Sequence, residues 1–323
     1  MWAVAMITVY SCGDSKNTPV SVIFDTDMGP DIDDVGALTI LHAMADSGEV
    51  RILATLASNQ HEYSVPCIDL INTYYGRPGL PVGATLTGPD KAAWPVENWT
   101  ETFTAHFPHH VKATADAPDA VQVYRRILAG EPDTSVVVVT VGFLTNLSAL
   151  LQSQPDQYSP LNGKQLVSRK VKHLVAMAGV FPQGSREFNV LTDTVATAMV
   201  FEQWPTRIIL SGSEIGGKVR TGKRLVAPES TLTPAKDAYM ICMQNKETWA
   251  SYDQTAVLVA VRGVDRYFNT VKGQVKLEAN ATTSWQDNPG GKHEYLTFKM
   301  PVDELEKVIE DLMMHEPVKK SKN

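Results

Sequence analysis

The chain has 323 residues, of which 43% are apolar and 20% charged, and its formal net charge is −7. This length allows a large buried core, and the composition argues against disorder. The acidic balance gives no support for binding to nucleic acid or to an acidic membrane surface through general electrostatics. Three cysteines, an odd and low number, exclude a disulfide framework, and their spacing matches no zinc motif.

An apolar run over residues 1–11 precedes Cys12 and a polar stretch. This order is typical of an export signal, and Val9 to Cys12 resembles a bacterial lipobox, in which the cysteine becomes the lipidated first residue. We therefore expect residues 1–18 to be a lipoprotein signal and tether, which would place the protein in the periplasm or at the outer membrane of a bacterium. If the segment is only a first strand, a cytoplasmic location is expected. The rest of the chain has no apolar run of about 18 residues, so no spanning helix is predicted.

Runs rich in valine and isoleucine alternate with segments of helical periodicity along the rest of the chain. The predicted strands are Val20–Phe24, Val50–Ala57, Ser135–Val141, Val171–Met177 and Thr206–Leu210. The predicted helices are Asp34–Ala45, Ser64–Tyr75, Ala117–Leu128, Leu144–Leu151, Thr194–Glu202, Ala235–Lys246, Thr255–Arg262 and Val302–Met314. Segments rich in Gly, Pro and Asn predict surface loops at residues 77–81, 153–164 and 280–292.

Strands that are almost entirely apolar are typical of a parallel sheet that is buried on both faces. Their alternation with helices predicts βαβ units joined by right-handed crossovers. We therefore predict a single α/β domain over residues 19–323, with a mainly parallel, Rossmann-like sheet flanked by helices.

The segment VIFDTDMGPDIDDVGAL, residues 22–38, places five aspartates directly after an apolar β-branched run. Carboxylates this close together cannot all stay ionised unless a cation or a proton offsets their repulsion, and a hard cation with oxygen ligands fits this need. The aspartates follow a predicted strand, at the end of the sheet where α/β folds bind ligands. Helix capping by Asp31 or Asp33 would use one or two acids and leaves the others unexplained. The spacing also lacks the glycine and glutamate of an EF-hand loop.

Two enzymatic interpretations fit this segment. Asp25 and Asp27, two residues apart after a strand, match the pattern of phosphatases that use an aspartate nucleophile, but this pattern does not require Asp33 and Asp34. The whole segment resembles the N-terminal fingerprint of the inosine–uridine-preferring nucleoside hydrolases, whose usual form is DxDPGxDDAxAL. Here Met28 stands in place of proline, and two extra residues precede the paired aspartates.

The resemblance continues in the same order along the chain. The matching segments are Ala57–Gln60 (ASNQ, for the ribose loop), Val141–Leu147 (VGFLTNL, for GPLTN), Met177–Gly179 and Glu187–Val190 (MAG and EFNV, for MGG…EFN) and Tyr252–Ala256 (YDQTA, for HDxxA). Five ordered motifs are far more specific than any one of them alone.

This resemblance implies a Ca²⁺-dependent hydrolase with the nucleoside hydrolase fold, which cleaves the N-ribosidic bond of ribonucleosides to ribose and free base. The implied calcium ligands are Asp27, Asp34, Asp253 and the main-chain carbonyl of Val141. Asp27 is also the implied base that accepts a proton from the attacking water. The implied substrate-binding residues are Asp33, Asn59, Met177, Glu187 and Asn189. Asp25 is expected to support the loop, whereas Asp31 has no counterpart in the fingerprint and is expected either to cap the helix or to support the ligands.

The chain departs from the family at Tyr252, where many members have a histidine that protonates the leaving base. A tyrosine, whose ordinary pKa is about 10, is a poorer acid at neutral pH. Activation of the leaving group is therefore left open between Tyr252, stacking by Trp249 or Phe181, and His293. The base preference is not assigned by the sequence. A nucleoside- or ribose-binding protein without turnover and an aspartate-nucleophile phosphatase remain alternatives, and the resemblance suggests a homo-oligomer.

Overall fold

The structure is a computed structural model that describes residues 18–91 and 96–318. Cys12 and the expected signal and tether, apart from Thr18, lie outside these residues, so lipidation and the location that follows from it stay predictions. Among the described residues, no helix is both long enough and apolar enough to cross a membrane.

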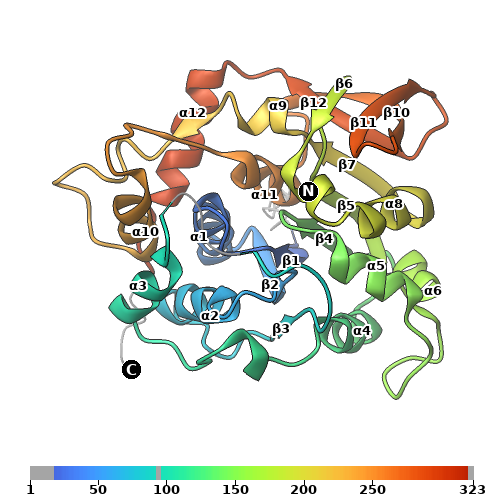
Figure 1. Cartoon of the computed structure of the whole chain (residues 1–323), viewed down its shortest axis with the longest axis horizontal. Coiled ribbons are helices and arrows are strands. Elements are labelled where there is room, and N and C mark those ends of the chain that lie inside the picture. The colour runs from blue at the N-terminus through green and yellow to red at the C-terminus, as the bar shows by residue number, and fades with distance from the viewer. Residues whose placement is uncertain (1–17, 92–95, 319–323) are drawn as a thin grey trace, which may run out of the picture.

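A ten-stranded sheet runs through the middle of the molecule (Figure 1). Its order is β3 (Val82–Ala84), β2 (Val50–Ala57), β1 (Val20–Thr26), β4 (Val136–Thr140), β5 (Val171–Met177), β7 (Arg207–Ser211), β12 (His293–Phe298), β10 (Phe268–Leu277), β11 (Thr282–Asp287) and β6 (Gln183–Arg186). The strands from β3 to β12 pair in parallel, and β10, β11 and β6 extend the sheet with antiparallel pairing. The predicted α/β domain with a mainly parallel sheet is therefore confirmed.

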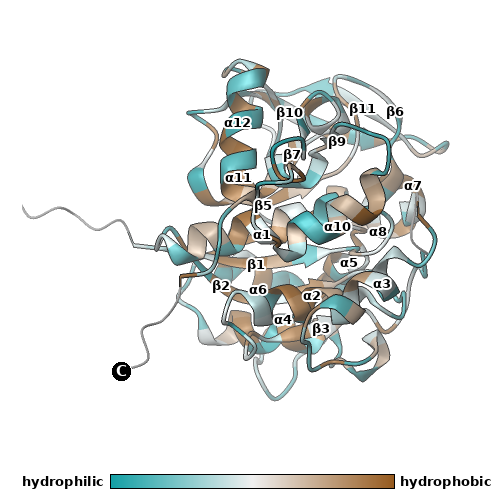
Figure 2. Ribbon diagram, turned by 90° about the vertical axis from the view of Figure 1, so that its left-hand side faces the viewer, coloured by the Kyte–Doolittle hydropathy of each residue, from teal (hydrophilic) through white to brown (hydrophobic). Residues whose placement is uncertain are grey.

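Helices cover both faces of the sheet. Successive residues of a strand point to opposite faces, so Val22 and Phe24 enter one apolar core and Ile23 enters the other. The first core is covered by α1 (Asp33–Asp46), α2 (Ser64–Tyr74), α3 (Trp99–His106), α10 (Pro234–Met243), α11 (Tyr252–Arg262) and α12 (Val302–Met313). The second core is covered by α4 (Ala120–Gly130), α5 (Thr145–Gln152), α6 (Gly163–Lys170) and α8 (Thr194–Gln203). Brown, hydrophobic ribbon is seen on helices such as α2 and α4, and teal ribbon marks much of the periphery (Figure 2).

Two of these helices are internal. Helix α1 is buried from Asp33 to Met44, and α11 is buried from Asp253 to Val261. A helix that is enclosed on all sides must be apolar around its whole circumference, which suits the alanines, leucines and valines of both segments. Since α1 and α11 pack on each other, their first turns are held inside the protein rather than at its surface.

The sequence did not predict the antiparallel end of the sheet, nor the parallel strands β3 and β12 and the helices α3 and α6. Residues 280–292 were expected to be a loop, but Thr282–Asp287 form β11 and pair with β10 and β6. These strands lie toward one side of the sheet and are only partly buried, so they lack the continuous apolar run that marks the parallel strands. The turn residues of this segment mark only the ends of the strand.

The order of the strands reverses between β1 and β4, which pair in parallel side by side. In open α/β sheets this reversal opens a crevice at the carboxyl ends of the strands. Gly142, just after β4, allows the two chain segments to approach each other there. A Cβ atom at Gly142 would collide with the main-chain nitrogen of Asp27 and would lie 2.7 Å from the Ser58 hydroxyl oxygen.

Gly142→Ala should therefore lower the free energy of unfolding by about 1–3 kcal/mol, the usual cost of overpacking. Gly130→Ala is the matched control, because a Cβ atom there meets no heavy atom within 4 Å. Thermal unfolding of the two variants beside the wild type measures the difference. Equal melting temperatures for Gly142→Ala and the wild type would contradict the close approach.

Candidate active site

A pocket of about 490 Å³ opens at the carboxyl ends of four neighbouring strands. Asp27 follows β1, Val141 follows β4, Met177 ends β5 and Ser213 follows β7. The residues that line the pocket are Asp27, Pro30, Asp31, Asp33, Val141, Met177, Arg186, Glu187, Phe188, Asn189, Ser213, Tyr252 and Asp253. This position at the reversal of strand order is where ligand sites of open α/β sheets form.

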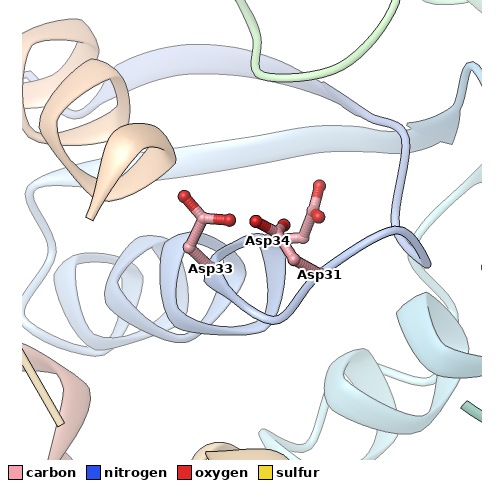
Figure 3. A group of neighbouring side chains, drawn as sticks. All are labelled: Asp31, Asp33 and Asp34. Carbon is pink, nitrogen blue, oxygen red and sulfur yellow. The ribbon is translucent and has the colours of Figure 1, made fainter. Parts of the chain in front are cut away.

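The buried helices α1 and α11 bring acidic residues from the two ends of the sequence together. Asp33 and Asp34 occupy the first turn of α1, and the main-chain N–H of Asp253, in the first turn of α11, donates a 3.2 Å hydrogen bond to Asp33. The hydroxyl of Thr26, the last residue of β1, donates to Asp34. Figure 3 shows Asp33 and Asp34 at the start of α1 and Asp31 on the loop just before it, with the three side chains close together.

Burial and mutual repulsion raise the pKa of these carboxyl groups. Burial is the largest cause for Asp27, Asp33 and Asp253, and the charges of the neighbouring aspartates add to it. For Asp34, burial and then the charge of Asp31 raise the pKa to about 8. The ionised cluster is therefore unfavourable as it stands, and a bound cation would stabilise it.

The donor set fits a hard metal ion. Asp31, Asp33 and Asp34 each offer an oxygen, and these oxygens lie within 4.8 Å of one another, so this acidic cluster can hold a metal. The other predicted ligands, Asp27, Asp253 and the Val141 carbonyl, belong to the same pocket and are oxygen donors as well. Oxygen-only sites of this kind suit Ca²⁺ or Mg²⁺ rather than metals that prefer nitrogen or sulfur ligands.

Two predicted substrate contacts lie in the pocket with defined hydrogen bonds. Glu187 accepts the N–H groups of Gly179, at 3.2 Å, and of Asn189, at 2.8 Å, which ties the pocket wall to the end of β5. The Asn189 amide nitrogen donates to the carbonyls of Val141, at 2.9 Å, and of Met177, at 3.2 Å. The Asn189 side-chain oxygen is therefore the part of the amide that is left to face a ligand.

Asn59 has a structural position instead. Its amide nitrogen donates to the carbonyls of Asp27 and Lys91, both at 3.0 Å, and its oxygen accepts the N–H groups of His61 and Lys91. These four bonds fill the capacity of the side chain. Asn59 is fully buried and is not among the residues that line the pocket, so we revise the expected ribose contact to support of the Asp27 loop.

Tyr252 lines the pocket at the first position of α11. Gly216 makes room for it, because a Cβ atom there would collide with the Tyr252 main chain. Burial, followed by the charges of Asp33 and Asp31, raises the pKa of the Tyr252 phenol above its usual value. The phenol therefore stays protonated and can donate a hydrogen bond.

The structure does not bring His293 to the pocket, which corrects that expectation. His293 begins β12 beside Ile208, so it lies toward the opposite end of the sheet from the pocket. It is buried, and its Nδ1 accepts the Val275 N–H at 3.1 Å. The sequence placed His293 after a flexible loop because the β10–β11–β12 strands were not predicted.

The two aromatic alternatives also lie outside the pocket lining. Phe181 stacks on Tyr295, with ring centroids 5.4 Å apart, and meets Trp285 edge-on. Trp249 is buried in β9 (Trp249–Ala250), where its side chain forms a hydrogen bond with Asp31. Neither ring is thus placed as a stacking surface for a base.

Asp25 is enclosed in the core rather than presented to a ligand. It is fully buried, and one carboxylate oxygen accepts the Tyr124 hydroxyl at 2.9 Å and the Asn146 amide at 3.1 Å. A nucleophile needs access to its substrate, so this position argues against the phosphatase alternative. The supporting role expected for Asp25 agrees with these contacts.

Sequence reasoning missed several residues of the pocket wall. Arg186 and Phe188 flank Glu187, and Ser213 follows β7. Arg186 and Phe188 could have been predicted from the sequence, because both are neighbours of Glu187, a motif residue that was expected in the pocket. Ser213 carries no local signal, since its place depends on β7 lying beside β5.

The fold is shared with solved nucleoside hydrolases. An inosine–guanosine nucleoside hydrolase has a TM-score of 0.68 and 20% identity, and the match covers 91% of this chain and 98% of that one. An inosine–uridine preferring nucleoside hydrolase from Bacillus anthracis has a TM-score of 0.65 and 17% identity over 91% and 99% of the two chains. A purine-preferring ribonucleoside hydrolase from Gardnerella vaginalis has a TM-score of 0.66 and 17% identity over the same shares. No curated protein sequence matches the chain.

The fold and the pocket thus define a nucleoside-hydrolase-like α/β protein. The family model of the inosine-uridine preferring nucleoside hydrolases matches residues 22–303, so the chain belongs to this family. As a member of this family, it is a hydrolase that acts on N-glycosyl compounds.

Asp25→Asn should change how stability depends on pH. Burial raises the pKa of Asp25 from 3.8 to about 7, so the folded state holds this proton more tightly than the unfolded state does. The contribution of Asp25 to stability is then complete below its unfolded pKa and is lost as the pH rises through about 7. The asparagine variant lacks this loss, and its stability relative to the wild type should increase from about pH 4 to about pH 8.

Urea unfolding across this pH range measures the effect, and Asp265→Asn, at an exposed position, is the control. Parallel pH profiles for Asp25→Asn and the wild type would show that burial does not disfavour the Asp25 charge.

Proposed function

We propose that the protein is a Ca²⁺-dependent ribonucleoside hydrolase, which cleaves the N-ribosidic bond to give ribose and a free base. The main support is that Asp27, Asp33 and Asp253, from the end of β1 and from the first turns of α1 and α11, converge in one pocket. Because the chain belongs to the nucleoside hydrolase family, cleavage of an N-glycosyl bond is the reaction that we assign to this acidic pocket.

Asp27, Asp34, Asp253 and the Val141 carbonyl would hold the cation. Three carboxylates and one carbonyl leave room for water and sugar hydroxyls among the six to eight oxygens that Ca²⁺ accepts. When bound, the ion lowers the pKa of water at the site and helps to orient the ribose. The Asn189 amide, which donates to the Val141 carbonyl, fixes the direction of that oxygen.

Side chains of the protein would accept the proton of the attacking water and stabilise the positive charge that develops on the sugar. Asp27 accepts a proton from the water that attacks the anomeric carbon, while the bond between that carbon and the base nitrogen breaks and its electron pair leaves with the base. The sugar gains positive charge as this bond lengthens, and the surrounding carboxylates stabilise it. Asp33, Glu187 and Asn189 would bind ribose hydroxyls, which disfavours sugars that lack them.

Tyr252 would act on the leaving base as a hydrogen-bond donor. Its phenol lies beside Asp31 and Asp33, whose charges oppose loss of the phenolic proton. A full proton transfer from this group is therefore unfavourable, while a hydrogen bond to a base nitrogen remains available. Substrates whose leaving group needs no proton should then depend least on Tyr252.

A panel of purine and pyrimidine nucleosides, assayed for free ribose, tests the proposed activity. The metal-loaded protein should release ribose from at least one substrate, and removal of the metal by a chelator should stop the reaction. Asp27→Ala should lose both tight calcium retention and turnover, because it removes a ligand and the base together. Wild-type turnover in this variant, or no ribose release from any nucleoside by the loaded wild type, would contradict the proposal.

Tyr252→Phe should lower kcat for natural nucleosides by roughly tenfold, the value of one hydrogen bond that forms in the transition state. Removal of a general acid would cost more, about 10²–10⁴-fold. p-Nitrophenyl riboside is the control substrate, because its leaving group departs without a proton, and its kcat should be unchanged. An equal loss of kcat on both substrates would show that Tyr252 does not act on the base.

A further inference from the structure

Asp31 lies in the two residues by which this chain exceeds the family fingerprint. Such an insertion in a loop usually bulges into solvent. Here Pro30 and Asp31 both line the pocket, and the Asp31 side chain is partly buried beside Asp33 and Asp34. The insertion therefore adds an acidic side chain to the pocket rather than to the surface.

Capping does not account for Asp31. The N-cap of α1 is Ile32, and no side chain forms a capping hydrogen bond at this end of the helix. Asp31 instead accepts a hydrogen bond from the side chain of Trp249, whose indole N–H can only donate. The indole thus holds one side of the Asp31 carboxylate, and the remainder faces the other acids.

The spacing of the acidic oxygens fits a single coordination sphere. One oxygen each of Asp31, Asp33 and Asp34 lies within 4.8 Å of the others. Two oxygens that bind one Ca²⁺, each at about 2.3–2.6 Å, can be at most about 5.2 Å apart. Figure 3 shows Asp31 beside Asp33 and Asp34, on the loop that leads into α1.

The charge of Asp31 acts on the whole cluster. Asp31 lines the same pocket as Asp27, Asp33 and Asp253, so it is close to the predicted calcium ligands from both β1 and α11. Asp27, Asp34 and Asp253 already carry more negative charge than one divalent ion balances. A fourth carboxylate beside them is costly without a cation, and it strengthens the attraction for a cation when one binds.

We propose that Asp31 is an additional carboxylate ligand of the metal centre, held in position by Trp249. This inference rests on the proposed metal-dependent function, and it concerns only the residues that bind the ion. The extra ligand favours Ca²⁺ over Mg²⁺, because Ca²⁺ accepts six to eight oxygens in flexible geometry, whereas Mg²⁺ requires a near-ideal octahedron and keeps several waters.

Calorimetric titration of Ca²⁺ and Mg²⁺ into the metal-free full chain tests the proposal. Asp31→Asn should bind Ca²⁺ at least about tenfold more weakly than the wild type, with a smaller loss for Mg²⁺. Asp31→Glu, which keeps the carboxylate, should bind Ca²⁺ more tightly than Asp31→Asn does. Asp265→Asn, which removes one exposed carboxylate far along the chain, should match the wild type.

Thermal unfolding distinguishes a role of Asp31 as a metal ligand from a role that only supports the fold. Without metal, Asp31→Asn should be at least as stable as the wild type, because one of several repelling carboxylates is gone. With Ca²⁺, its rise in melting temperature should be smaller than that of the wild type. A structural role would instead lower the melting temperature with and without the ion.

Unchanged Ca²⁺ affinity in Asp31→Asn, or equal losses of stability with and without Ca²⁺, would overturn the assignment. Turnover of nucleosides by the wild type together with either result would leave the proposed function intact and remove only the role of Asp31. Weaker Ca²⁺ binding in Asp31→Asn, with no turnover of any nucleoside by the wild type, would support the ligand and contradict only the proposed function.

Discussion

The enclosure of several aspartates in one pocket is the constraint on which the rest of the structure depends. A buried carboxylate loses its hydration, and a group of them also repels itself, so the protein must offset both effects. The N-terminal turns of α1 and α11 point partial positive charge at the cluster. The Thr26 hydroxyl and the Asp253 N–H add hydrogen bonds, and the remaining charge creates the demand for a cation.

The two helices whose first turns carry the aspartates, α1 and α11, both lie inside the protein. Because α1 and α11 are enclosed by the sheet and by outer helices, their first turns cannot move toward solvent to relieve the repulsion. Gly142 and Gly216 bring neighbouring main chain into contact with Asp27 and Tyr252, where any side chain would collide. The main chain of the pocket is thus closely packed beside Asp27 and Tyr252. Asp25 and Asn59 support the pocket from behind, because both are fully buried and neither lines it.

In the proposed function, the part of the pocket wall that is left for the base is built differently. Arg186 ends β6, Phe188 begins the short helix α7 (Phe188–Thr192), Ser213 follows β7, and Tyr252 takes the place of the histidine that many family members have. This division agrees with the chemistry, because the sugar is common to all nucleosides and the base is not. In the proposed function, a tyrosine beside aspartates would donate a hydrogen bond rather than a proton, and catalysis would depend more on the charges around the sugar.

Local sequence patterns were enough to predict five parallel strands (β1, β2, β4, β5 and β7), the enclosed helices and the acidic segment at the end of β1. These features are local, since an unbroken run of valine and isoleucine, or a helical period, is visible within ten residues. The sequence also placed Asp27, Asp33 and Asp253 in one site, through five ordered motifs. The tertiary structure alone decided that Asn59 is saturated by main-chain bonds, that His293 lies at the far end of the sheet and that Asp31 faces the pocket. Each of these depends on which distant segment lies next to the residue, and no local pattern records that neighbour.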